Sequence, residues 1–156
     1  MDLDGAALRA IGELTVVLDR ECRLIDELHR AVLQQREAVS RGDQVGVESS
    51  LRLAGRALLT LQEARRHRAT LLNRLVGDPA QPLADLDGRF ETGLPASFLA
   101  ARARVQSSAA GVAEEVWRNQ ETLLGALRKR DALLQELLTG SPPTPSEEPP
   151  AATVEG

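Results

Sequence analysis

Apolar residues recur at every seventh position through the first part of this chain. The series consists of Ile11, Leu18, Ile25, Val32 and Val39. This spacing places one side of a helix against a partner helix along its whole length. A companion series alternates apolar and polar residues and consists of Leu14, Glu21, Leu28 and Gln35. We therefore expect long helices that lie along one another, with polar groups interrupting one flank of the contact.

The composition agrees with narrow contacts between helices. The chain has two phenylalanines, one tryptophan and no tyrosine among 156 residues, so Leu, Ala and Val must supply most of the apolar mass. The net charge is −4, with 19 basic and 23 acidic residues interspersed. Such a balance does not favour binding to nucleic acid or to an anionic membrane surface. No apolar run approaches the roughly 20 residues needed for a membrane span, so no membrane insertion is expected.

Two features of the sequence indicate the cellular compartment in which the protein is expected. The single cysteine, Cys22, cannot form a disulfide within the chain, which is typical of a reducing environment. The N-terminal residues are acidic and lack the basic start and apolar core of a signal peptide. We therefore expect a cytoplasmic protein.

Turn residues divide the chain into three expected helices, at about 4–40, 43–76 and 95–139. Gly42 can end the first helix and Asp43 can cap the second, so the two should form a tight antiparallel hairpin. Pro95 suits the first turn of the third helix. The expected fold is all-α: a long antiparallel hairpin plus a third long helix, in a coiled-coil-like three-helix bundle that forms one domain over residues 1–139.

The segments between and after the helices differ in character. In the irregular connection 77–94, Leu83, Leu86 and Phe90 should fold back onto the end of the hairpin, because they are poorly suited to full solvation. The segment 140–156 holds five of the eight prolines and is acidic, and it is expected to be disordered.

The expected seams contain polar residues. In a hairpin that turns near Gly42, Glu21 lies opposite Arg65, and this predicts an interhelical pair that fixes register. The alternative is that both side chains reach solvent at the edge of the seam. The seam expected on the second helix comprises Val47, Leu51, Ala54, Leu58, Leu61, Arg65, Arg68, Leu72 and Leu75. The seam expected on the third comprises Phe98, Val105, Ala109, Val112, Val116, Asn119, Leu123, Ala126, Leu133 and Leu137.

Asn119 is a further candidate for fixing register. The small residues at 107–111 are interpreted as a place where two helices approach closely or where the long helix bends. The alternative interpretation, a gap that admits a ligand, is less favoured.

The residues suited to catalysis or metal binding are few. Cys22, His29 and His67 are scattered, and no phosphate loop or dinucleotide fingerprint occurs, so we expect no enzyme, no cofactor and no metal site. The basic run Arg65-Arg66-His67-Arg68 is interpreted as a solvated helix face, because no aromatic residue interleaves with it.

The end of the third helix is unusually rich in leucine. The candidate partner-binding residues are Leu123, Leu124, Leu127, Leu133, Leu134, Leu137 and Leu138. They cover more of the helix circumference than one seam needs, and by register counting this helix should overrun the hairpin tip by roughly two to three turns. The expected result is an exposed apolar patch that another helix could cover. A second copy of the chain is the alternative occupant.

Several short motifs stand out along the chain: Arg36-Glu37-Ala38-Val39, Gly42-Asp43, Arg68 before Leu71-Leu72, and Asn119-Gln120-Glu121-Thr122-Leu123-Leu124. Together they resemble flagellar type III export chaperones of the FlgN type. The resemblance covers residues 10–138 approximately. It implies a cytoplasmic chaperone, monomeric or weakly dimeric, that binds the C-terminal helical segments of hook–filament junction proteins, prevents their premature assembly and delivers them to the export gate.

The resemblance also carries a departure. Family members commonly dock on the gate through a C-terminal tyrosine, which this chain lacks, and Trp117 is the only nearby aromatic residue. The resemblance implies that cargo binds at about residues 119–138. The competing hypothesis is a self-assembling coiled-coil scaffold or adaptor protein.

Overall fold

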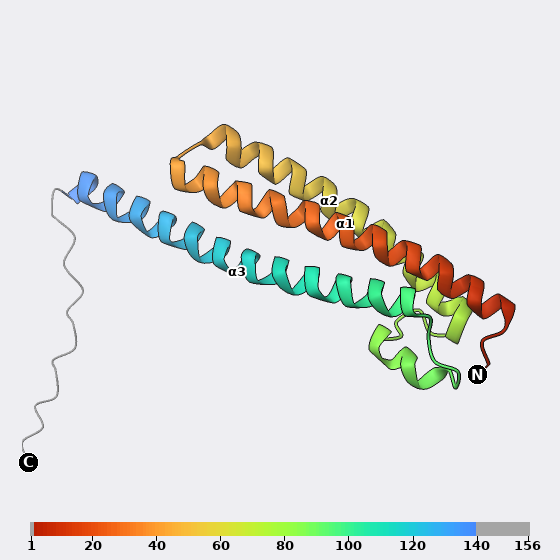
Figure 1. Ribbon diagram of the computed structural model, residues 1–156. Helices are drawn as coiled ribbons and strands as arrows, with labels where there is room; N and C mark the ends of the chain where they lie inside the picture. The colour runs from red at the N-terminus through yellow and green to blue at the C-terminus, as the bar shows by residue number, and fades with distance from the viewer. Residues whose placement is uncertain (1, 140–156) are drawn as a thin grey trace, which may run out of the picture. The chain divides into compact units, whose positions relative to one another are not determined.

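The structure, a computed structural model, describes residues 2–139, except for the side chains of Thr122, Leu123 and Ala126. It consists of α1 (Gly5–Arg41), α2 (Gln44–Val76), the 3-10 helix η1 (Leu83–Arg89) and α3 (Ala96–Thr139) (Figure 1). The predicted all-α fold is confirmed, and each long helix begins and ends within one residue of its expected bounds. The segment 140–156, expected to be disordered, lies outside the described residues.

The chain divides into two compact units rather than the single domain expected over 1–139. The first unit is Met1–Gln120 and the second is Glu121–Gly156, so α3 contributes to both. The first unit contains the hairpin, the connection and the start of α3. The described part of the second unit is helical to Thr139.

Local sequence accounts for the helix ends. Asp4 precedes α1, and its carboxylate accepts hydrogen bonds from the backbone N–H groups of Ala6 and Ala7 at 3.0 and 2.7 Å. Gly42 ends α1 with φ of 68°, a left-handed conformation that glycine adopts without steric cost. Asp43 then caps α2 by accepting a hydrogen bond from the Gly46 N–H at 2.9 Å. A cap and a glycine together make the tight hairpin turn.

The contact between α1 and α2 contains much of the apolar core. From α1 it takes the expected heptad residues up to Val32, together with Leu14 and Leu28. The residues buried on α2 are Ser50, Ala57, Leu61, Ala64, Leu71, Leu72 and Leu75. The seam predicted for α2 was wrong on one flank, because Leu51 and Leu58 are exposed.

Small side chains explain this rotation of α2. Ser50, Ala57 and Ala64 occupy the flank that Leu51 and Leu58 were expected to fill. Because small residues let two helix backbones approach closely, their burial can favour this rotation even though two leucines stay in solvent. A prediction based only on hydrophobicity assigns Leu51 and Leu58 to the buried seam instead.

The connection folds back onto the end of the hairpin, as predicted. Leu86 and Phe90 are buried and Leu83 packs against the same core. Arg102 of α3 fastens η1 in place, since its guanidinium donates to the Leu83 carbonyl at 2.9 Å and to both oxygens of the Asp87 carboxylate at 3.0 Å each. These contacts hold η1 against the first turns of α3.

Within the first unit, α3 runs parallel to α1. The contacts join Asp19 to Arg104, Cys22 to Ser108, and Arg36 to Glu115, so residue numbers rise together on both helices. The side chains that face α1 or the core are Phe98, Ala101, Val105, Ser108, Val112, Glu115 and Asn119, spaced by alternating steps of three and four. Ala109 and Val116, which were predicted for this seam, are exposed. The residues that face α1 at these levels are Ser108 and Glu115, each one position earlier in the chain.

Candidate functional site

Exposed leucines gather on the part of α3 that belongs to the second unit. The described ones are Leu124, Leu127, Leu133, Leu134, Leu137 and Leu138, and the last two are 81 % and 84 % exposed. The side chain of Leu123, the remaining candidate, lies outside the described residues. Exposed large apolar side chains that recur at helical spacing are typical of a surface that binds another helix.

Four of these residues form what we call the leucine stripe: Leu124, Leu127, Leu134 and Leu138. They occupy the series 124, 127, 131, 134 and 138, with alternating steps of three and four, which is the spacing of a coiled-coil contact. Asp131 is the single polar member of the series. Leu137 lies next to the stripe in this pattern.

The leucine stripe does not continue the seam that packs on α1. Counting on from Asn119 in the steps of that seam gives Thr122, Ala126, Lys129, Leu133 and Glu136, of which only Leu133 is a leucine. The two series occupy different sides of a regular helix. The leucine stripe is therefore a separate apolar surface with a spacing of its own.

Trp117 belongs to the first unit and is 63 % exposed. An indole in this position presents a large apolar body to solvent. This exposure is compatible with the predicted docking role.

Glu21 pairs with Arg68 and not with Arg65, so the predicted partner was wrong by about one helical turn. The Arg68 guanidinium donates to Glu21 Oε2 at 2.7 Å, and Glu21 is 1 % exposed. Two features account for the difference. Arg65 is exposed because α2 is rotated, and helical side chains lean toward the N-terminus of their own helix. In an antiparallel pair, two side chains that touch therefore come from Cα positions that are not directly opposite. Each Cα lies closer to the C-terminus of its own helix, so Glu21 reaches Arg68 and not Arg65.

Burial raises the pKa of Glu21 above its ordinary value of 4.5, while the positive charges of Arg68 and Arg65 act in the opposite direction. Its second oxygen, Oε1, is buried and accepts no hydrogen bond from the described residues. Because a buried carboxylate with one unsatisfied oxygen is costly, Glu21 depends strongly on Arg68. This group specifies how the hairpin pairs and has no access to a substrate.

The second polar interruption of α1, Gln35, pairs with α3. The Asn119 amide Nδ2 donates to Gln35 Oε1, and Asn119 is buried. Nearby, the Arg36 guanidinium donates to the Glu115 carboxylate at 2.7 Å. The sequence indicated Asn119 as a register residue but did not identify Gln35 as its partner.

Two of the small residues of α3, Ser108 and Gly111, face α1, whereas Ser107, Ala109 and Ala110 are exposed. Cys22 Sγ and Ser108 Oγ lie 3.4 Å apart, and the His29 ring lies 3.6 Å from the place where a Cβ on Gly111 would stand. Cys22 and His29 thus pack between α1 and α3, whereas His67 is exposed on α2. Within the described residues, no group of three or more His, Cys, Asp or Glu side chains could hold a metal ion.

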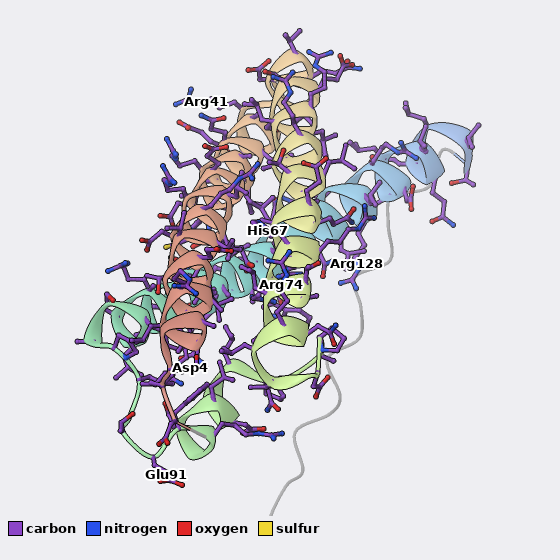
Figure 2. The ribbon with its side chains drawn as sticks, turned by 90° about the vertical axis from the view of Figure 1, so that its right-hand side faces the viewer. Asp4, Arg41, His67, Arg74, Glu91 and Arg128 are labelled. Carbon is purple, nitrogen blue, oxygen red and sulfur yellow. The ribbon has the colours of Figure 1, made fainter. Side chains whose placement is uncertain are left out.

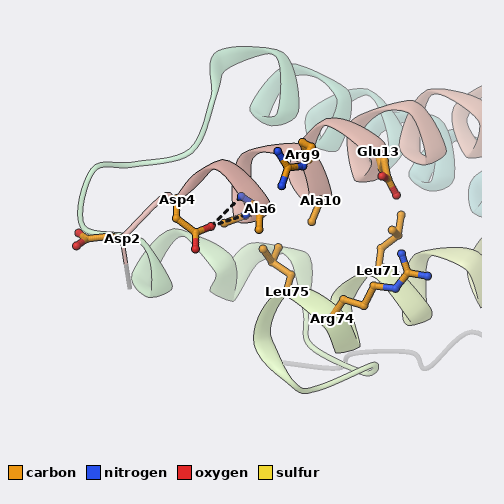
Figure 3. Close-up of a pocket in the computed structure, with 10 residues that line it drawn as sticks. Asp2, Asp4, Ala6, Arg9, Ala10, Glu13, Leu71, Arg74 and Leu75 are labelled. Atoms are coloured by element: carbon orange, nitrogen blue, oxygen red, sulfur yellow. Dashed lines mark hydrogen bonds between the residues drawn. The ribbon is translucent and has the colours of Figure 1, made fainter.

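A pocket of about 370 Å³ lies where the start of α1 meets the end of α2 (Figure 3). Ala6, Ala10 and Leu75 contribute apolar surface, while charged residues such as Arg9 and Arg74 also line it. The nearby Asp4 carboxylate is engaged in capping α1. This arrangement lacks a buried polar group directed at a ligand.

Comparison with protein-family models, with curated proteins and with solved structures finds no match for this chain. None of the helices in residues 2–139 has both the length and the apolar character required to cross a membrane.

Proposed function

We propose that this chain is a flagellar type III export chaperone of the FlgN type, which binds the C-terminal helical segments of hook–filament junction proteins in the cytoplasm. In this role it keeps the cargo unassembled and delivers it to the export gate. The observation that carries the proposal is the leucine stripe, a set of exposed leucines at coiled-coil spacing on a long helix.

Two further features support this assignment. The Gly42-Asp43 motif forms the hairpin turn, with Gly42 left-handed and Asp43 capping α2. Arg68, which precedes Leu71-Leu72 in the family-like motif, holds the buried Glu21 carboxylate. These two motifs thus have structural roles in the hairpin, while the leucine stripe remains available for cargo. Trp117 is the residue we propose for contact with the gate.

The proposal is tested by co-expressing the full chain with C-terminal segments of hook–filament junction proteins and measuring complex formation by size-exclusion chromatography with light scattering. A stoichiometric complex is expected with the unaltered chain. Leu134→Asp and Leu138→Asp should abolish it, because each places a charge on a surface that must be desolvated.

Leu59→Asp is the matched control. Leu59 lies on α2 and is 66 % exposed, so this variant adds the same charge at an exposed leucine outside the leucine stripe. It should bind cargo as the unaltered chain does. Equal loss of binding in the control, or a tight dimer of the chain alone that ignores cargo, would contradict the proposal and favour the scaffold function.

A further inference from the structure

Asp131 interrupts the leucine stripe at its centre. Leu124 and Leu127 precede it in the series and Leu134 and Leu138 follow it. Its side chain is 71 % exposed, and the Arg130 guanidinium approaches it at 3.9 Å, the outer limit of an ion pair. The carboxylate is therefore largely solvated in the chain alone.

A helix that covers the leucine stripe must also cover Asp131. Taking a carboxylate out of water without a counter-charge costs several kcal/mol, more than the burial of one leucine side chain returns. Arg130 is at the edge of ion-pair distance, so it offers weak compensation. A well-matched partner helix must supply a positive charge at this layer.

Two of the residues that flank the leucine stripe near its centre are basic. Arg128 and Arg130 precede Asp131, and both occupy positions that border the series in a coiled-coil pattern. Arg128 extends away from the helix, as the side-chain view shows (Figure 2). Such flanking residues select partners through charges on the facing helix.

We propose that the leucine stripe selects an amphipathic helix whose apolar stripe is interrupted at its centre by Lys or Arg and bordered by Asp or Glu. This inference rests on the proposed function, and it specifies the chemistry of the cargo segment. It also disfavours a parallel pair of two copies of this chain, which would bring Asp131 against the Asp131 of the second copy.

The test uses the full chain and two synthetic peptides that share one heptad pattern of leucines. They differ only at the central apolar position, which is Lys in one peptide and Glu in the other. Fluorescence anisotropy of labelled peptide should show roughly tenfold tighter binding of the Lys peptide. Asp131→Lys should reverse this preference.

Glu136→Lys is the matched control, because Glu136 is an exposed acidic residue of the same part of α3 but lies outside the leucine stripe series. This variant makes the same change in net charge and should retain the preference for the Lys peptide. If it reverses the preference as Asp131→Lys does, the selection comes from net charge and the inference is overturned.

The remaining outcomes separate this inference from the proposed function. Equal binding of both peptides, lost in Leu134→Asp, overturns the charge selection and leaves the docking surface standing. Failure of both peptides to bind overturns the docking surface as well. A dimer of the chain alone that Leu134→Asp dissociates identifies a second copy as the occupant and overturns the inference.

Discussion

The ends of α2 and α3 carry the same kind of residue at the same spacing, with opposite results. Leu71, Leu72 and Leu75 are buried in the core at the end of α2, whereas Leu133, Leu134 and Leu137 are exposed near the end of α3. Apolar spacing therefore shows that a helix has an apolar side, but it does not show where the partner comes from. For α2 the partner is α1 of the same chain; for α3 we propose a cargo helix.

The largest expected effect comes from placing a charge among the buried leucines of α2 and, separately, among the exposed leucines of α3. Leu71→Asp should cost roughly 5 kcal/mol or more of unfolding free energy, because it removes a core side chain and buries a carboxylate. Leu134→Asp should cost only about 1 kcal/mol, since this side chain is 46 % exposed and Asp is a poorer helix former than Leu. Urea unfolding followed by far-UV circular dichroism measures both. Comparable destabilisation by the two variants would show that Leu134 belongs to a core.

The next largest effect concerns the charged pair of the hairpin. Arg68→Ala should lower the unfolding free energy by about 3 kcal/mol near neutral pH, because it leaves the Glu21 carboxylate buried without its partner. Arg65→Ala, one turn away and exposed, is the control and should cost much less. Equal effects of the two substitutions would contradict the pairing in the structure.

The pH dependence sharpens this prediction. Because burial raises the pKa of Glu21 above 4.5, the folded protein holds a proton over a range in which the unfolded chain has released it. The contribution of this group to stability is therefore largest below about 4.5 and declines as the pH rises through the raised pKa. Arg68→Ala should steepen this decline, and adding Glu21→Gln to it should remove the effect. Thermal melts across a pH series provide the measurement.

A smaller effect is expected between α1 and α3. Asn119→Ala removes the hydrogen bond to Gln35 and should cost about 1–2 kcal/mol, because a part-buried amide loses its partner. Gln35→Ala should cost a similar amount, and the double variant should cost less than the sum. Strict additivity in denaturant unfolding would show that the two amides do not interact.

The smallest effect lies at the surface of the same interface. Asp19 and Arg104 form an exposed ion pair, so their coupling energy should be only about 0.5 kcal/mol. It should fall further as salt is added. A double-mutant cycle at low and high ionic strength measures this coupling, and a value that is large or independent of salt would contradict an exposed pair.

The sequence predicted the helices better than the contacts between them. Gly42, Asp43 and Pro95 act on their immediate neighbours, so local chemistry suffices to locate the ends of the helices. The rotation of α2 depends on how closely two backbones approach, which favours Ala57 and Ala64 over Leu58. That preference is a property of the assembled pair, and a hydrophobic pattern in one helix does not contain it.

The candidate site was located by composition more than by spacing. The excess of leucine after Glu121 indicated an apolar surface, and most of the predicted residues are exposed. Leu133 and Leu134 were predicted as parts of one surface, although the two follow different series along the helix. Asp131 was not predicted, because its position becomes informative only when the leucine stripe is separated from the seam that packs on α1.

The parallel course of α1 and α3 has a consequence for biosynthesis. The side-chain pairs between these helices join residues 79 to 86 positions apart, whereas the hairpin turn joins immediate neighbours. Contacts that are local in sequence close faster, and a chain emerges from the ribosome N-terminus first. The hairpin can thus be complete while α3 is still being translated, so the leucine-rich segment emerges after the hairpin has had time to fold.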